Sequence, residues 1–128
     1  MEHIHIQGSK DVYIQPTVDF EVATGRCSIS GESFLEETAK FYSPMVEWIK
    51  AYSRFGKNID FTFSLTYFNT STSKWILTIL AELKKLEGQG VAVNVVWHYH
   101  EDDVDMRDDI SDYMADTGLK IDLVPFNE

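Results

Sequence analysis

The sequence predicts a single α/β domain with a mixed sheet, in which N-terminal strands and a hairpin precede parallel strands joined by helices. Three observations lead to this prediction. Short alternating apolar and polar residues fill the first thirty positions. Beyond them, segments with apolar residues at helical spacing take turns with strand-like segments, an order typical of parallel sheets with crossover helices. The length of 128 residues suits one domain around one core.

The N-terminal strands are short and are bounded by turn residues. Alternation of apolar and polar side chains predicts them around Ile4 and Ile6, and at Val12–Ile14, Thr17–Glu21 and Arg26–Ser30. The segment Ala23–Gly25 would join the last two strands as a hairpin, because glycine adopts a positive φ without steric cost.

The first helix is predicted over about Glu36–Arg54, after a polar start at Gly31–Ser33. Its apolar residues recur at helical spacing, at Phe41, Met45, Trp48, Ile49 and Tyr52. Pro44 disturbs the pattern, since proline removes one backbone hydrogen bond from a helix. Either the helix kinks there, or its regular part begins at Ser43 with Pro44 in the first turn.

The second half of the chain alternates strands and helices. The clearest strand is Ile59–Phe68, where apolar and polar residues alternate throughout. The later elements are predicted as a helix over Ser71–Glu87 ending at Gly88 or Gly90, a strand at Val91–Tyr99, a helix over Asp103–Asp116 ending at Gly118, and a strand at Lys120–Phe126.

The charge and the cysteine content restrict the function. A net charge of −10 argues against binding to nucleic acid or to anionic membranes, which requires clustered lysine and arginine. The chain has no run of 18 apolar residues and no start of signal-peptide type, so we expect a cytoplasmic protein without membrane insertion. The single cysteine, Cys27, is interpreted as a half-buried hydrophobic residue of a strand, with a reactive thiol as the alternative.

Acidic residues concentrate between Glu101 and Asp112, where seven acids accompany one base, Arg107. A solvated helix face explains such a run, and a docking surface for a basic partner is the alternative.

The segment "LTYFNTSTSKW" raises a question because five small polar residues, Asn69 to Ser73, follow a strand and precede a helix. Asn69, Thr70 and Ser71 can each cap the helix, but capping needs only one or two of the five. In parallel α/β sheets, functional sites lie beyond the carboxyl ends of strands, where the next helix begins. A phosphate is favoured there, since free N–H groups and the helix dipole attract negative charge.

A second polar constellation is "WHYHEDD", in which His98 and His100 point to one face if the strand continues. With a following carboxylate they could hold zinc or another divalent ion, although histidines at a strand end followed by helix-capping aspartates explain the same residues. His3 and His5 form a similar pair.

Motifs of catalysis and of cofactor binding are missing from the sequence. It has no glycine-rich phosphate loop, no G-x-S-x-G elbow and no catalytic-cysteine signature, and we predict no cofactor. The aromatic residues of the first helix are interpreted as a core stripe rather than a ligand box: Tyr42, Trp48, Tyr52 and Phe55.

The stretch "LTYFNTSTSKW", preceded by "NIDFTFS" and followed by "VAVNVVWHYHEDD", resembles the SiaC family of bacterial regulatory phosphoproteins. The likeness covers nearly the whole chain, and the N-T-S-[ST] turn is its specific part. It implies a single domain over residues 1–128 with a fold similar to the STAS domain of anti-sigma factor antagonists. The Asp-Ser-x-Gly turn of STAS domains has no counterpart, because Asn69 replaces the acid and Lys74 stands nearby instead of glycine.

The resemblance implies that Thr70 is the phosphorylated residue. Asn69 and Ser71 are its neighbours in the motif, and Thr72 stands where a second serine is expected. Ser71 and Thr72 therefore remain alternative phosphorylation sites. Asn69, Ser71 and Thr72 are expected in the partner-binding surface.

The resemblance also implies three protein partners and no enzymatic activity. A serine/threonine kinase of the histidine-kinase-like ATPase type would phosphorylate the chain, and a PPM-type phosphatase would reverse the reaction. The unmodified form would bind and activate a diguanylate cyclase, which connects the switch to cyclic-di-GMP and biofilm formation. A metal-binding module or metal-dependent enzyme using His98 and His100 is the alternative.

Overall fold

The computed structural model describes residues 1–127 and contains a six-stranded sheet in the order β1-β4-β5-β6-β7-β8. The strands of this sheet are β1 (Ile4–Ile6), β4 (Thr17–Phe20), β5 (Arg26–Ser33), β6 (Asn58–Phe68), β7 (Ala92–His100) and β8 (Asp122–Phe126). The helices are α1 (Thr38–Ala51), α2 (Thr70–Gly88) and α3 (Val104–Thr117), with a 3₁₀ turn η1 (Tyr52–Arg54) after α1. The predicted mixed sheet is confirmed, because β1, β4 and β5 pair antiparallel and β5 to β8 pair in parallel.

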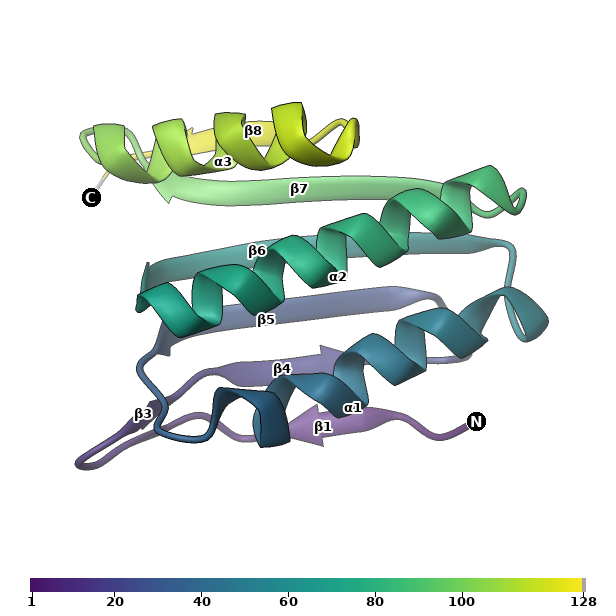
Figure 1. Cartoon of the computed structure of the whole chain (residues 1–128), viewed down its shortest axis with the longest axis horizontal. Coiled ribbons are helices and arrows are strands. Elements are labelled where there is room, and N and C mark those ends of the chain that lie inside the picture. The colour runs from purple at the N-terminus through teal and green to yellow at the C-terminus, as the bar shows by residue number, and fades with distance from the viewer. Residues whose placement is uncertain (128) are drawn as a thin grey trace.

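All three helices cover the same face of the sheet (Figure 1). Each helix connects two neighbouring parallel strands, and successive strands are added in one direction. Because such crossovers share one hand, every helix returns on the same side. The molecule is therefore a two-layer α/β structure whose other sheet face is uncovered.

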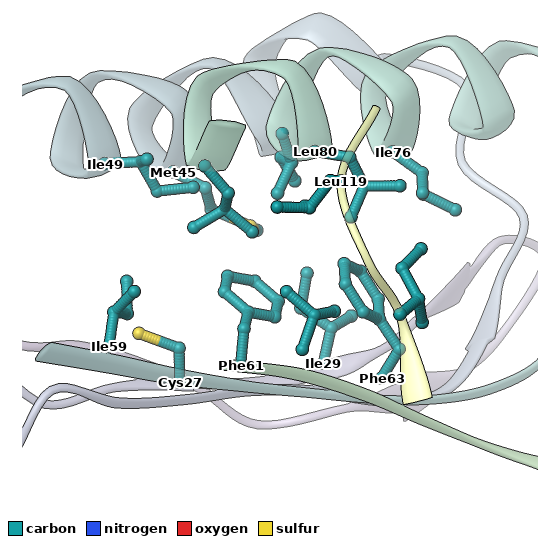
Figure 2. Close-up of a cluster of buried hydrophobic side chains, with 14 of the residues drawn as sticks. Cys27, Ile29, Met45, Ile49, Ile59, Phe61, Phe63, Ile76, Leu80 and Leu119 are labelled. Carbon is teal, nitrogen blue, oxygen red and sulfur yellow. The ribbon is translucent and has the colours of Figure 1, made fainter. Parts of the chain in front are cut away.

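The core lies between these two layers, as Figure 2 shows. On the sheet side, Ile59, Phe61 and Phe63 of β6 are fully or almost fully buried, while the alternate residues face away. Ile76 and Leu80 of α2 point toward them from the helix layer. The alternating apolar and polar residues of β6 therefore form a strand, as predicted, because successive side chains of a strand face opposite sides of the sheet.

The hairpin between β4 and β5 confirms the prediction for Ala23–Gly25. Gly25 has a φ of 75°, and its N–H donates to the carbonyl of Glu21 at 3.0 Å. A side chain at Gly25 would overlap the carbonyl of Asn58 and the hydroxyl of Tyr52. Glycine is required there by both conformation and space.

The first helix differs from its prediction at three points. It begins at Thr38 and continues through Pro44, so the start at Ser43 was wrong. Pro44 is exposed, and the loss of its N–H leaves the carbonyl of the preceding turn facing solvent. Tyr42 is fully buried whereas Phe41 is half-buried, and Phe55 is exposed rather than part of the core stripe.

The predicted strand at Val12–Ile14 was also wrong. Instead, β2 (Ser9–Lys10) and β3 (Ile14–Gln15) form a separate two-stranded ribbon, and Val12 lies in its exposed connection. The backbone of Ile14 exchanges two hydrogen bonds of 2.9 Å with that of Phe34. The ribbon is therefore held next to the end of β5, which no local pattern indicates.

Among residues 1–127, none of the helices combines the length and the apolar character that crossing a membrane requires.

Candidate functional site

The polar turn at Asn69–Ser73 lies where the carboxyl ends of the central strands meet the N-terminal ends of the helices (Figure 1). Asn69 follows β6 directly, and its backbone N–H donates to the carbonyl of Ser33 at the end of β5, at 3.2 Å. The first residue of α2 is Thr70. The predicted position of the turn at a strand-to-helix edge is thus confirmed.

Asn69 is the N-cap of α2 and uses one oxygen atom for three donors. Its Oδ1 accepts the backbone N–H of Thr72 at 3.1 Å, the hydroxyl of Thr72 at 2.7 Å and the hydroxyl of Ser71 at 3.2 Å. Its backbone carbonyl accepts the N–H of Ser73 at 3.0 Å. The extended backbone of Asn69, with ψ of 173°, aims the amide oxygen into the first turn, as an N-cap requires.

A chain of buried hydroxyl groups lies beneath this cap. The Thr72 Oγ1 is 3.0 Å from the Ser33 Oγ, which is 2.7 Å from the Tyr42 hydroxyl. All three side chains are fully buried. Burial raises the pKa of Tyr42 to about 12, although the hydrogen bonds from Ser33 and Thr72 lower it. The chain joins β5, α1 and α2 at one point.

The four hydroxyl-bearing residues of the turn, Thr70 to Ser73, differ in the accessibility of their hydroxyl groups. Thr70 and Ser71 are exposed, and within residues 1–127 the Thr70 hydroxyl has no hydrogen-bond partner. Thr72 is fully buried, so its hydroxyl is inaccessible in the folded protein. Ser73 is half-buried, and its Oγ lies 2.5 Å from the hydroxyl of Tyr113 in α3.

Aromatic side chains are exposed on one side of the turn. Tyr13 in the connection of the β2–β3 ribbon stacks on Phe34, with ring centroids 6.1 Å apart, and both are 41% exposed. A groove of about 390 Å³ between this ribbon and α1 is lined in part by Tyr13, Leu35 and Phe41. This side offers apolar contact area beside the polar turn.

Carboxylates flank the other side of the turn. Tyr67, which is 50% exposed, shares a shallow groove with Asp103, Asp105 and Asp109 at the start of α3. Burial raises the pKa of Asp109, and the neighbouring carboxylates, Asp112 first among them, raise it further. The carboxylates of the acidic run are nevertheless exposed except for the half-buried Asp103, so the structure agrees with the solvated helix face that the sequence suggested.

The alternative hypothesis was a metal site that uses His98 and His100. β7 continues through His100, so His98 and His100 do lie on one face, which is the uncovered face of the sheet. The His100 Nδ1 accepts the backbone N–H of Asp102 at 3.1 Å, and its ring contacts Phe126 edge-on. Within residues 1–127, no three histidine, cysteine or acidic side chains converge as metal ligands.

Cys27 is buried in β5, as the interpretation of a strand hydrophobe predicted. Burial raises the pKa of its thiol, and the charge of Asp60 acts in the same direction. The thiolate is therefore disfavoured, and a nucleophilic role does not fit this environment.

Sequence reasoning missed Ser33 and Tyr42 as members of the site. Ser33 was taken as part of a polar helix start, and Tyr42 as a core aromatic. A serine at the end of a strand is common, and nothing in the sequence connects it with a turn 39 positions further on.

Fold and site together describe a small α/β regulatory domain with an exposed threonine at a helix start. The sequence profile of the SiaC family regulatory phosphoproteins matches residues 6–126. The chain belongs to the SiaC family. A curated relative, an uncharacterized protein of Pseudomonas aeruginosa strain UCBPP-PA14, is 27% identical over 100 residues, which cover 77% of each chain.

Solved structures of SiaC from Pseudomonas aeruginosa share the fold at 22% identity. One has a TM-score of 0.83 and full coverage of both chains, and apo-SiaC has a TM-score of 0.80 with 97% of this chain and 99% of that chain covered. A third match, with a TM-score of 0.86, is to the crystal structure of the diguanylate cyclase SiaD in complex with its activator SiaC, where 96% of this chain and 99% of that chain are covered. The fold expected from the family resemblance is confirmed.

Proposed function

We propose that this chain is a non-enzymatic, cytoplasmic signalling phosphoprotein that is reversibly phosphorylated on Thr70. In its unmodified form it binds and activates a diguanylate cyclase, and a serine/threonine kinase and a PPM-type phosphatase set its state. The observation that carries the proposal is the exposed Thr70 hydroxyl, free of hydrogen bonds beside neighbours that are engaged. The activator role rests on SiaC of Pseudomonas aeruginosa, which is the activator in the complex with SiaD.

A phosphate on Thr70 is compatible with the folded state. Among residues 1–127, the N–H groups of Thr70 and Ser71 donate to no capping acceptor, whereas those of Thr72 and Ser73 donate to Asn69. These free donors and the helix dipole favour a nearby anion by roughly 0.3 to 2 kcal/mol. Phosphorylation would therefore change the surface without unfolding α2.

The surface around Thr70 exposes hydrophobic residues of the kind found in protein-binding surfaces. Among residues 1–127, five of the eight exposed large hydrophobic residues belong to segments at this end of the sheet, namely Val12, Tyr13, Phe34, Tyr67 and Val104, whereas Met1, Phe55 and Val124 do not. Exposed apolar groups that collect in one region are typical of interaction sites. In this proposal Asn69 and Ser71 contact the partner, while the buried Thr72 supports them from beneath.

Phosphorylation would act by electrostatics and desolvation. A phosphoryl group adds about −1.5 to −2 charges, and burying it in an interface without a cation costs several kcal/mol. Since 1.4 kcal/mol is tenfold in affinity, the partner would bind on the order of a hundredfold more weakly.

The site assignment is tested by incubating the full chain with ATP and the histidine-kinase-like serine/threonine kinase of the same genome. We expect one phosphoryl group, located on Thr70 by mass spectrometry, and no incorporation in Thr70→Ala. Incorporation that persists undiminished in Thr70→Ala would show that another residue is the site.

The activator role is tested by calorimetry with the diguanylate cyclase of the same genome. Unmodified protein should bind and stimulate the cyclase, and Thr70→Asp should bind at least about tenfold more weakly, because aspartate carries only part of a phosphate's charge. Thr70→Ser is the matched control and should bind as the wild type does. Absence of wild-type binding would refute the activator role, and equal affinity for Thr70→Asp would refute its control by phosphorylation.

A further inference from the structure

We propose that Asn69 is a specificity-determining residue, whose amide oxygen engages the hydroxyl groups of Ser71 and Thr72 and leaves Thr70 as the acceptor for phosphoryl transfer. This inference rests on the proposed function and assigns the choice among adjacent hydroxyl groups to one side chain. It concerns a turn in which four hydroxyl-bearing residues follow one another, the last of which, Ser73, is half-buried with its Oγ against the hydroxyl of Tyr113.

The Asn69 oxygen, where the network ends, determines which hydroxyl group is the donor in each hydrogen bond. The Asn69 Oδ1 has no proton, so the hydroxyl groups of Thr72 and Ser71 must donate to it. A hydroxyl has one proton to give. Because Thr72 gives its proton to Asn69, Ser33 must donate to Thr72, and Tyr42 must donate to Ser33. Each hydrogen bond between Tyr42 and Asn69 therefore has only one possible donor.

The backbone N–H of Thr72 fixes the orientation of the Asn69 side chain. An N–H can only donate, so the side-chain atom that it meets at 3.1 Å is the oxygen and not the nitrogen of the amide. At its inner end, this row of hydrogen-bonded hydroxyl groups consists of Tyr42 in α1 and Ser33 in β5, which are both fully buried. Hydrogen bonds in such chains strengthen one another, so the amide oxygen is held where it meets Ser71.

The consequence for phosphoryl transfer differs among the three residues. In the reaction a bond forms between the acceptor oxygen and the γ-phosphorus of ATP, the bond to the β-phosphate oxygen breaks, ADP leaves, and the hydroxyl proton passes to a base of the kinase. The Thr70 proton is free for that base. The Ser71 proton is directed to Asn69 at 3.2 Å, and the Thr72 hydroxyl is buried.

The test compares two substitutions at Asn69 in the full chain. Asn69→Gly removes the acceptor oxygen but keeps a residue that is accepted at N-caps. Asn69→Asp keeps an oxygen acceptor at the same position. Each protein is incubated with ATP and the kinase, and mass spectrometry measures the ratio of phosphoserine at 71 to phosphothreonine at 70. Urea unfolding midpoints show that each variant is folded.

We expect phosphorylation of the wild type and of Asn69→Asp on Thr70, and a ratio about tenfold higher in Asn69→Gly, the effect of releasing one hydrogen bond. A merely structural role for Asn69 would change the overall rate but not this ratio. An unchanged ratio in Asn69→Gly, or an equal rise in Asn69→Asp, would overturn the inference while leaving Thr70 as the site. Absence of phosphorylation in the wild type would instead refute the proposed function.

Discussion

Thr72 ties three elements together through one buried hydroxyl group. Its Oγ1 contacts Asn69 at the start of α2 and Ser33 at the end of β5, and Ser33 contacts Tyr42 of α1. A methyl group in place of this hydroxyl would leave the Ser33 proton without an acceptor. The start of α2 is thus held by a polar contact inside the core and not by the exposed cap alone.

Replacement of Thr72 by valine should therefore destabilise the fold by about 1–3 kcal/mol, the cost of a buried polar group that loses its partner. Thr72→Ser keeps the hydroxyl and should retain most of the stability. Urea unfolding measures both. Equal stability of Thr72→Val and the wild type would show that the buried hydroxyl chain contributes nothing to folding.

Tyrosine burial gives the fold a dependence on alkaline pH. The pKa of Tyr42 and that of Tyr113 are each raised to about 12 in the folded state, chiefly by burial, from an unfolded value of about 10. The native protein therefore binds more protons than the unfolded chain between these pH values. The contribution of these tyrosines to stability is fully present below pH of about 10 and falls as the pH rises toward about 12.

Urea midpoints between pH 8 and about 11.5 measure this fall. In Tyr42→Phe the fall should be smaller but not absent, because Tyr42 no longer titrates while Tyr113, Tyr52 and Cys27, whose pKa values are also raised, still do. An identical pH dependence in the variant and the wild type would exclude Tyr42 as a contributor.

At the scale of elements, α3 combines a stabilising start with internal repulsion. Asp103 caps the helix by accepting the N–H of Met106 at 3.0 Å, and Gly118 ends it with a φ of 73°. Between these ends, Asp105, Asp109 and the acids around them lie on neighbouring turns, where like charges repel. The helix is retained because its other face packs on the core.

The effect of this repulsion is seen at Asp109, whose pKa is raised by burial and by four neighbouring carboxylates. A raised pKa means that ionisation opposes folding, so Asp109→Asn should be more stable than the wild type at pH 7. The gain should vanish below the ordinary carboxyl pKa of about 3.8, where the wild-type group is protonated. Thermal unfolding at pH 7 and pH 3 measures the difference.

Asp108→Asn is the matched control, since it removes the same charge from the adjacent position outside the groove. Its gain at pH 7 should be smaller. If both substitutions stabilise equally, general charge reduction explains the effect and the environment of Asp109 does not.

At the scale of the whole molecule, the topology sends the start of every helix to one end of the sheet (Figure 1). Exposed hydrophobic residues gather at this end, and Thr70 lies among them. The opposite end also exposes one phenylalanine, Phe55, which follows η1. The two ends therefore allow a direct comparison of like residues.

Phe34→Ala should weaken binding of the diguanylate cyclase by about tenfold or more, because a buried aromatic anchor contributes over 1 kcal/mol at an interface. Phe55→Ala removes the same side chain from the far end and should leave the affinity unchanged. Calorimetry with the unmodified protein measures both. The reverse order of effects would place the partner at the other end.

Particular residues show how far sequence could predict this structure. The β4–β5 hairpin, the strand β6 and the end of α3 at Gly118 follow from patterns within a few residues, and all were predicted. The alternative helix start at Ser43 and the strand at Val12 were wrong, because tertiary contacts override local preference there. α1 continues past Pro44 as its buried face packs on the sheet, and Phe34 fixes the ribbon next to Val12.

By itself, the sequence determined the order of the elements, the polar turn after β6 and membership of the family, because these depend on local spacing and on a short motif. The tertiary structure decided which hydroxyl is free. Thr72 is buried by contacts with Ser33, 39 positions away, and Asn69 then engages Ser71. Hydrogen bonds between distant segments form only when β5, α1 and α2 are packed, so no reading of the turn alone could separate Thr70 from its neighbours.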